Sequence, residues 1–204
     1  MSQIATQPVS NLVDSINANP RPRRWTREEY YRMADCGLFQ GQRAELIEGE
    51  IMVMSPQNWP HSSTVDRVGE LFRRVLGAGV WVRTQMPMNL GASSDPEPDI
   101  SVVVGRRADY TDHPMSALLI VEISQTTLDY DRGRKASLYA QVGVRDYWIV
   151  NLVDLQVEVY RQPAPDASQH YGHAYGSQTV LGPGDTVAPL AFPQVSIPVA
   201  DLLP

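Results

Sequence analysis

The sequence predicts an α/β (α+β) fold in which helices flank a mixed central β-sheet. One observation is the spacing of apolar residues over residues 62–76, which recur every three or four positions and are typical of an amphipathic helix. Another is a pair of short, β-branched and nearly continuous apolar runs at residues 99–104 and 118–123. Such runs are typical of strands that are buried on both faces of a sheet.

Local signals predict the elements in the first half of the chain. A capping box, Thr26 with Glu29, predicts a short helix that ends near Gly37. Two apolar runs on either side of a Glu-Gly pair predict a tight β-hairpin over residues 44–54. We expect two further strands near residues 80–85 and 86–90.

The second half is expected to add one helix and more strands. Asp131 has the residue type of an N-cap and predicts a helix over residues 132–142, with Gly143 as its end. Residues 146–150 and 155–161 are interpreted as a hairpin. From about residue 162 the chain is rich in proline and glycine, with short β-like pieces such as residues 178–181.

A length of 204 residues suits one domain. Residues 1–23 are polar and aperiodic, so we expect a flexible N-terminal arm followed by a single domain over residues 24–204. The segment from about residue 162 is expected to belong to that domain.

Composition limits the class of protein. The net charge of −6 argues against a dedicated, non-specific nucleic-acid binder, because phosphate contacts normally require a basic surface. It leaves room for an enzyme that meets nucleic acid through one local patch. A single cysteine fits a reducing compartment, and no secretory signal or run of about 20 apolar residues is visible. The expectation is a soluble, cytoplasmic protein without a membrane association.

Two carboxylates occupy unusual places in the predicted strands. Glu122 lies in a strand of otherwise aliphatic residues, where a carboxylate is costly unless it is paired, protonated or bound to metal. Asp99 opens the other buried strand. If the two strands are neighbours, the two side chains offer the hard oxygen ligands that Mg²⁺ takes from proteins. The alternative is that each is an ordinary polar residue at a strand end.

Lys135 is the only lysine in a chain that has sixteen arginines. We expect it, with Arg132 and Arg134, in the first turn of the predicted helix, where positive charge opposes the helix dipole. Such a departure from local preference tends to mark function. A lysine can also shift its pKa, which an arginine essentially cannot.

A series of short motifs, in a fixed order, resembles the Uma-two family of putative restriction endonucleases. The motifs are Glu45-Leu46-Ile47-Glu48-Gly49-Glu50-Ile51, Ser55-Pro56 with His61, Pro96-Glu97-Pro98-Asp99-Ile100, Val121-Glu122-Ile123-Ser124, the segment from Tyr130 to Tyr139, and the segment from Gly143 to Val150. The resemblance covers about residues 25–161. It implies a restriction-endonuclease-like fold, whose signature is Pro-Asp followed by an Asp/Glu-x-Lys triplet.

The resemblance implies a site as well. Asp99 matches the signature aspartate and Glu122 the signature glutamate, but Ser124 stands where the lysine is usual. In this family the lysine is supplied by the following helix, which here means Lys135. Glu45 and His61 match family positions with less defined roles.

The function that follows is Mg²⁺-dependent (or Mn²⁺-dependent) hydrolysis of phosphodiester bonds in DNA, with Arg132 and Arg134 gripping substrate phosphates. The resemblance also implies a homodimer, because nucleases of this fold often act as dimers to cut both strands. One alternative is a catalytically inactive module of the same fold that binds nucleic acid or a protein. A two-carboxylate glycosidase is a weaker alternative, because it explains neither the lysine nor the arginines.

Overall fold

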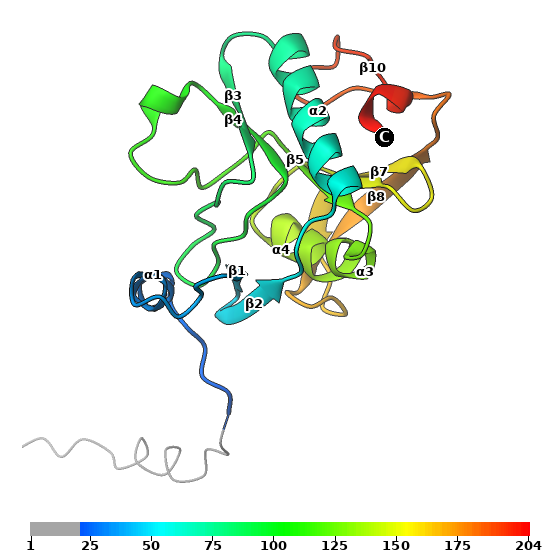
Figure 1. Ribbon diagram of the computed structural model, residues 1–204. Coiled ribbons are helices and arrows are strands. Elements are labelled where there is room, and N and C mark those ends of the chain that lie inside the picture. Colours follow the sequence, from blue (N-terminus) through cyan, green and yellow to red (C-terminus); the bar gives the residue numbers. More distant parts are fainter. Residues whose placement is uncertain (1–20) are drawn as a thin grey trace, which may run out of the picture.

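The computed structural model describes residues 21–204, so the expected N-terminal arm lies almost wholly outside the described residues. The core of the fold is one six-stranded sheet with the order β3-β4-β5-β6-β7-β8 (Figure 1). Its strands are β3 (Val80–Thr84), β4 (Ile100–Val104), β5 (Leu119–Ser124), β6 (Asp146–Asn151), β7 (Gln156–Pro165) and β8 (His173–Leu181).

The sheet is mixed. β5 and β6 are parallel, and the remaining neighbours in the sheet are antiparallel. The parallel pair needs a crossover connection, which the helical segment between the two strands supplies. This segment consists of α3 (Leu128–Tyr130), a π-helical turn η3 (Asp131–Lys135) and α4 (Ala136–Gln141). The predicted fold class is therefore confirmed.

One face of the sheet packs against α2 (Trp59–Val75) and the end of the chain. The apolar residues of α2 that recur at helical spacing, such as Val68 and Phe72, are fully buried there. Trp148 of β6 meets Phe72 edge to face, with 6.0 Å between the ring centroids. The covering from the chain end comes from β9 (Thr186–Val187), β10 (Ile197–Pro198) and η4 (Val199–Leu202).

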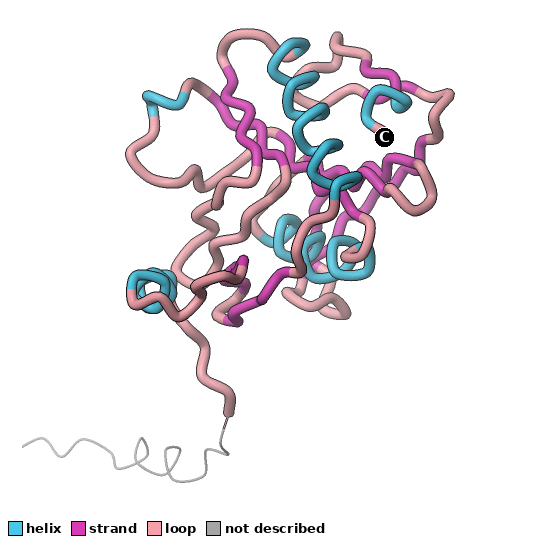
Figure 2. The backbone as a smooth tube through the Cα atoms, in the orientation of Figure 1, coloured by secondary structure: helices cyan, strands magenta, loops and turns pink. Residues whose placement is uncertain are grey.

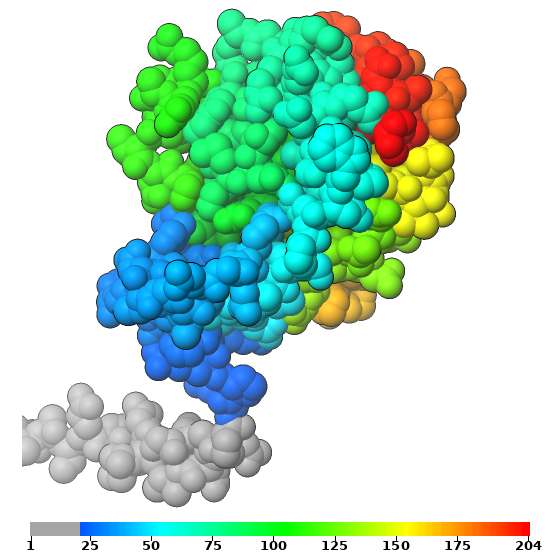
Figure 3. All heavy atoms as spheres, viewed as in Figure 1, coloured from blue at the N-terminus to red at the C-terminus, as the bar shows by residue number. Residues whose placement is uncertain are grey.

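The other face packs against α4 and residues near the hairpin of β1 (Arg43–Ile47) and β2 (Glu50–Met54). Tyr139 of α4 and Tyr147 of β6 lie in this layer with their rings 5.2 Å apart. The capping box of Thr26 and Glu29 begins α1 (Arg27–Asp35) as expected. Figure 3 shows α1 and the start of the hairpin as a blue lobe below α2.

Residues 86–90 do not form the expected strand, and Figure 2 shows irregular backbone between β3 and β4. Apolar residues alternate in this segment because Met88 and Leu90 are buried in the same core cluster as residues of α4. The backbone N–H groups of this segment donate to loop carbonyls, such as Met88 N–H to Pro96 O at 2.8 Å. Pro87, which has no N–H, also disfavours a paired strand.

Asp131 is not the N-cap of a helix, which corrects the sequence prediction. The helical segment already begins at Leu128, and the Asp131 side chain accepts a hydrogen bond from Thr127 Oγ1 at 2.7 Å. Lys135 is therefore not in the first turn, and the expected crowding of cations at a helix N-terminus does not occur. β8 is also longer than the predicted strand at residues 178–181, because it pairs with β7 over most of its length.

None of the helices within residues 21–204 combines the length and the apolar character that crossing a bilayer requires.

Candidate active site

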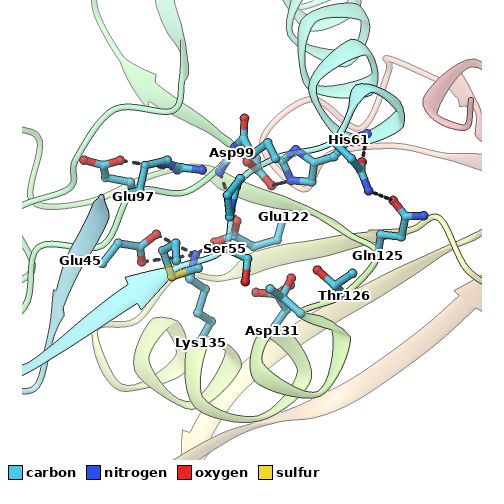
Figure 4. A pocket seen from close by; sticks show the side chains of 16 residues that line it. Glu45, Ser55, His61, Glu97, Asp99, Glu122, Gln125, Thr126, Asp131 and Lys135 are labelled. Atoms are coloured by element: carbon cyan, nitrogen blue, oxygen red, sulfur yellow. Dashed lines mark hydrogen bonds and ion pairs between the residues drawn. The ribbon is translucent and has the colours of Figure 1, made fainter. Parts of the chain in front are cut away.

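Acidic side chains surround a single lysine where β4 begins and β5 ends (Figure 4). They line a small cavity of about 60 Å³. Each water molecule needs roughly 10–15 Å³ of such space, so the cavity has room for an ion with a few water molecules. The side chains that form the candidate site are Glu45, His61, Glu97, Asp99, Glu122, Asp131 and Lys135.

Sheet register places Asp99 and Glu122 opposite one another. Ile100 of β4 pairs with Val121 of β5 in an antiparallel ladder, so the preceding and following residues face each other. Two hydrogen bonds fix this arrangement: Asp99 N–H donates to Glu122 Oε2 at 3.2 Å, and Ile123 N–H donates to Asp99 Oδ2 at 2.9 Å. The two carboxylates are thus held by backbone groups of two neighbouring strands of the sheet, β4 and β5.

Lys135 reaches the same carboxylates from the crossover helix. Its Nζ lies 3.0 Å from Glu122 Oε1 and 3.4 Å from Glu45 Oε2. It is the last residue of the π-helical turn, in which Ala136 N–H donates to the Asp131 carbonyl five residues before it. Turns of this kind are rare and are frequent at functional sites. The hydroxyl of Tyr147 also donates to that carbonyl, at 3.0 Å, which supports the turn from the sheet side.

Glu122 receives a further donor from the next helical turn. Tyr139 OH donates to Glu122 Oε1 at 2.8 Å. Glu45 enters from β1, and its Oε2 is buried without a hydrogen-bond partner although Lys135 is near. A lysine, a phenol and a backbone N–H thus surround Glu122 within the protein.

Asp99 is held on its other side by residues of two different layers. His61, in the first turn of α2, places Nε2 3.1 Å from Asp99 Oδ2. Gln85 Nε2 donates to Asp99 Oδ1 at 3.3 Å. Burial acts to raise the pKa of Asp99, but the hydrogen bonds from His61 and from the Ile123 N–H outweigh it and lower the pKa. Asp99 therefore stays ionised.

The pKa values of Glu122 and Lys135 are both raised, for different reasons. Burial raises the pKa of Glu122 to about 8, against the attraction of Lys135, and the neighbouring Asp99 raises it further. Burial lowers the pKa of Lys135, but the charges of Glu122 and Glu45 outweigh it and raise the pKa well above its ordinary value. Lys135 is therefore a fixed cation, and Glu122 is a carboxyl group that exchanges a proton near neutral pH.

The donor set of the cavity fits a hard divalent cation. Five carboxylates (Glu45, Glu97, Asp99, Glu122 and Asp131) and two cations (Arg43 and Lys135) line it, which leaves a surplus of three negative charges when all are ionised. Within residues 21–204 no three His, Cys, Asp or Glu side chains have the arrangement of a metal site. A metal here would take two side chains, Asp99 and Glu122, which is the number that Mg²⁺ commonly takes from protein.

Arg132 and Arg134 do not line the cavity. Arg132 Nε donates to Glu158 Oε2 at 2.9 Å, and Glu158 is completely buried. Arg134 lies 2.8 Å from Glu50 of the hairpin. The structure thus brings together Asp99, Glu122, Lys135, Glu45 and His61 and leaves the two arginines in ion pairs elsewhere.

Sequence reasoning gave no site role to Asp131 and Tyr139. Asp131 lines the cavity and is 3% exposed, and burial raises its pKa despite the attraction of Lys135. The signal that would have found them is spacing: Asp131, Lys135 and Tyr139 follow one another at intervals of four, which keeps them on one side of a helix.

Comparison with known proteins agrees with this fold. The crystal structure of a putative nuclease belonging to DUF820, from Anabaena variabilis ATCC 29413, matches with a TM-score of 0.59 at 19% sequence identity. The match covers 78% of this chain and 88% of the other. A search of curated proteins finds no match. Residues 27–200 match the Uma2 family, described as putative restriction endonuclease. Because that match spans most of the chain, the protein belongs to the Uma2 family.

Proposed function

We propose that the protein is a metal-dependent endonuclease that hydrolyses phosphodiester bonds in DNA. Membership of the Uma2 family supports a nuclease function. The observation that carries the proposal is the convergence of Asp99, Glu122 and Lys135, in which the lysine comes from a helix and not from β5. Two carboxylates and one lysine in a buried cavity supply the residue types that this chemistry needs.

Asp99 and Glu122 are the residues that would hold Mg²⁺ or Mn²⁺. Such an ion, when bound, polarises a phosphoryl oxygen and acidifies a water molecule. The residues fit because Asp99 is kept ionised by its hydrogen bonds, while the surplus of negative charge in the cavity favours a cation.

Lys135 contributes a positive charge that does not depend on pH in the neutral range. Its position beside Glu122 suits it to orient a water molecule or to stabilise negative charge that develops on the phosphoryl group. Tyr139 keeps Glu122 in place through its hydrogen bond, and His61 does the same for Asp99. Both are positioning residues in this mechanism.

Nicking of supercoiled plasmid DNA, with and without Mg²⁺ or Mn²⁺, tests the proposal. The wild type should nick only in the presence of the metal, and Asp99→Asn and Glu122→Gln should each lose about 100-fold or more in rate. Both substitutions keep the size of the side chain, and circular dichroism should show an unchanged fold. Nicking by either variant at the wild-type rate would refute the assignment.

A catalytically inactive module is the second candidate. It is favoured because the lysine of the site is already paired within the protein. Lys135 is 3% exposed and contacts two glutamates. Titration calorimetry with Mg²⁺ and Mn²⁺ separates the candidates. Metal binding that is lost in Asp99→Asn supports the nuclease, and no metal binding by the wild type supports the inactive module.

A homodimer is part of the proposal, because an enzyme with one site per chain needs two copies to cut both strands at once. Sedimentation equilibrium of the protein alone and with duplex DNA tests it. A protein that stays monomeric in both would nick single strands only.

A further inference from the structure

A second cavity follows the open edge of the central sheet. β3 is the first strand in the sheet order, so within the described residues one side of its backbone has no partner strand. An open groove of about 550 Å³ runs beside it, lined by residues of α2 and of the loop that carries the short helix η2 (Arg107–Asp109). Figure 1 shows α2 and this loop on either side of β3 and β4. A neighbouring cavity of about 300 Å³ shares Trp81, Arg83, Met86 and Arg107 with the open groove. We call the two together the β3-edge groove.

The β3-edge groove is basic in an acidic protein. Arg73, Arg83, Arg106 and Arg107 line its larger part, where there is no carboxylate. The smaller part has one carboxylate, Asp112, which is paired with Arg27. Within residues 21–204, three of these arginines form no ion pair, and Arg106 forms only a long one, 3.9 Å from Asp109. Other arginines, such as Arg132 and Arg161, are paired with buried carboxylates. Three guanidinium groups without an ion pair, and a fourth that is only weakly paired, favour an anion that carries several charges.

Arg83 gives independent evidence for a ligand. It is 1% exposed, and its Nε has no hydrogen-bond partner. Its other nitrogens donate to Pro87 O at 2.7 Å and Ser101 Oγ at 3.3 Å, which are neutral acceptors. The guanidinium lies 5.0 Å from the centroid of the Trp81 ring, a contact that offsets part of the cost of burial. A buried charge without a counter-ion is costly to fold, so a bound anion would complete its surroundings.

The groove leads to the candidate active site. Thr84 lines the groove, and the next residue, Gln85, donates to Asp99 through both its side chain and its backbone N–H. α2 joins the same two places, because His61 lies in its first turn and Arg73 in its last. The twelve-residue step from His61 to Arg73 spans about 18 Å along the helix axis. That distance corresponds to about five nucleotides at roughly 3.4 Å each.

We propose that the β3-edge groove binds the sugar-phosphate backbone of a nucleic-acid strand, about five nucleotides away from the phosphate at the active site. The inference rests on the proposed function. It also explains how an acidic protein with a negatively charged cavity retains a polyanionic substrate, since the groove supplies attraction that the cavity lacks. The contacts are to phosphates, so they hold the strand without reading its sequence.

Binding measured without metal tests the groove separately from catalysis. Fluorescence anisotropy in EDTA would compare a labelled DNA duplex of about 20 base pairs, one of its single strands, and an RNA duplex of equal length. The groove variant carries Arg73→Gln and Arg107→Gln. The control variant carries Arg74→Gln and Arg145→Gln, which removes the same charge from exposed arginines that do not line the groove. Arg74 is the helical neighbour of Arg73, so the two variants are closely matched.

The groove variant should bind at least one of the three probes about tenfold more weakly than the control variant at about 50 mM salt. Its plot of log affinity against log salt concentration should be shallower by about two, because two phosphate contacts are lost. Equal affinities and slopes in the two variants would overturn the proposal, and so would a wild-type protein that binds none of the probes. Wild-type binding that persists in Asp99→Asn, with nicking lost, identifies the groove and the catalytic site as separate parts.

Discussion

Lys135 Nζ lies 3.0 Å from Glu122 Oε1, although the two residues come from different elements of the fold, the crossover helix and β5. A lysine two residues after Glu122 would share its strand face, but Ser124 stands there and contacts Thr127. The positive charge comes instead from Lys135, in the helical segment that connects β5 to β6. The site therefore keeps its cation although the strand motif lacks it.

Two neighbouring tyrosines provide a matched test of the hydrogen bond to Glu122. Tyr139→Phe removes a donor from a buried carboxyl oxygen and should lower the free energy of unfolding by about 1–3 kcal/mol. Tyr130→Phe should change it little, because the buried Tyr130 hydroxyl has no partner. Urea unfolding at pH 7 measures both. Equal effects of the two substitutions would contradict the assigned hydrogen bond.

Metal binding should release a proton. The pKa of Glu122 is about 8 in the metal-free fold against 4.5 ordinarily, because of burial, so the group is largely protonated at pH 7. A metal ligand must be deprotonated, so Mg²⁺ affinity should rise with pH, by up to about tenfold per unit, and level off above pH 8. Calorimetry at pH 7 in buffers with different ionisation enthalpies should show about one proton released per site. No proton release would contradict this titration.

The same shift has a consequence for stability. In the unfolded chain Glu122 loses its proton near pH 4.5, whereas in the fold it keeps it up to about pH 8. The folded state binds more protons than the unfolded state in that interval. The contribution of Glu122 to the free energy of unfolding is therefore complete below pH 4.5 and is lost as pH rises towards 8. Thermal unfolding of the metal-free protein and of Glu122→Gln, followed from pH 5 to about 8, should show a smaller decline in the variant.

We predict that Arg132 stabilises the fold through its ion pair with the buried Glu158. Burial acts to raise the pKa of Glu158, but hydrogen bonds from Arg132, Asn151 and Tyr160 outweigh it and lower the pKa to about 2. The stabilisation is therefore present above pH 4.5 and is lost as pH falls towards 2. Arg132→Met should cost about 1–3 kcal/mol at pH 7, because Glu158 loses its cation but keeps the hydrogen bonds from Asn151 and Tyr160.

Arg134→Met is the control for Arg132→Met. Arg134 pairs with Glu50 at the surface, where both side chains are about a third exposed, so its loss should cost at most about 1 kcal/mol. Urea unfolding of the two variants gives the comparison. If both variants bind DNA much more weakly than the wild type, the phosphate contacts that the sequence predicts for Arg132 and Arg134 are supported.

The sequence predicted the elements whose periodicity reflects burial. The residues of α2 keep helical spacing because one side of the helix packs on the sheet, and β4 and β5 are apolar because both of their faces are covered. Residues 86–90 show the limit of this argument. Met88 and Leu90 are buried from an irregular loop, and hydrophobic alternation alone does not distinguish such a loop from a strand.

The site was predictable where sheet register decided it. Two carboxylates at the ends of neighbouring antiparallel strands must meet if the strands pair, and Asp99 and Glu122 do. The start of the crossover helix was not predictable, because Asp131 has the residue type of an N-cap but lies inside the helix and its side chain joins the cavity. The arginines of the β3-edge groove were not found, because no spacing in the sequence joins α2, β3 and η2.

The rate of metal-dependent plasmid nicking by Lys135→Met tests the central claim most directly. Methionine keeps the unbranched shape of the side chain but lacks its terminal ammonium group, and adding Glu45→Gln removes the negative charge that the lost cation would leave unbalanced. We expect both the single and the double variant to lose about 100-fold or more in rate while circular dichroism shows an intact fold and the DNA affinity in EDTA stays unchanged. A folded Lys135→Met that nicks DNA within a few-fold of the wild-type rate would contradict the claim that the helix supplies the catalytic lysine.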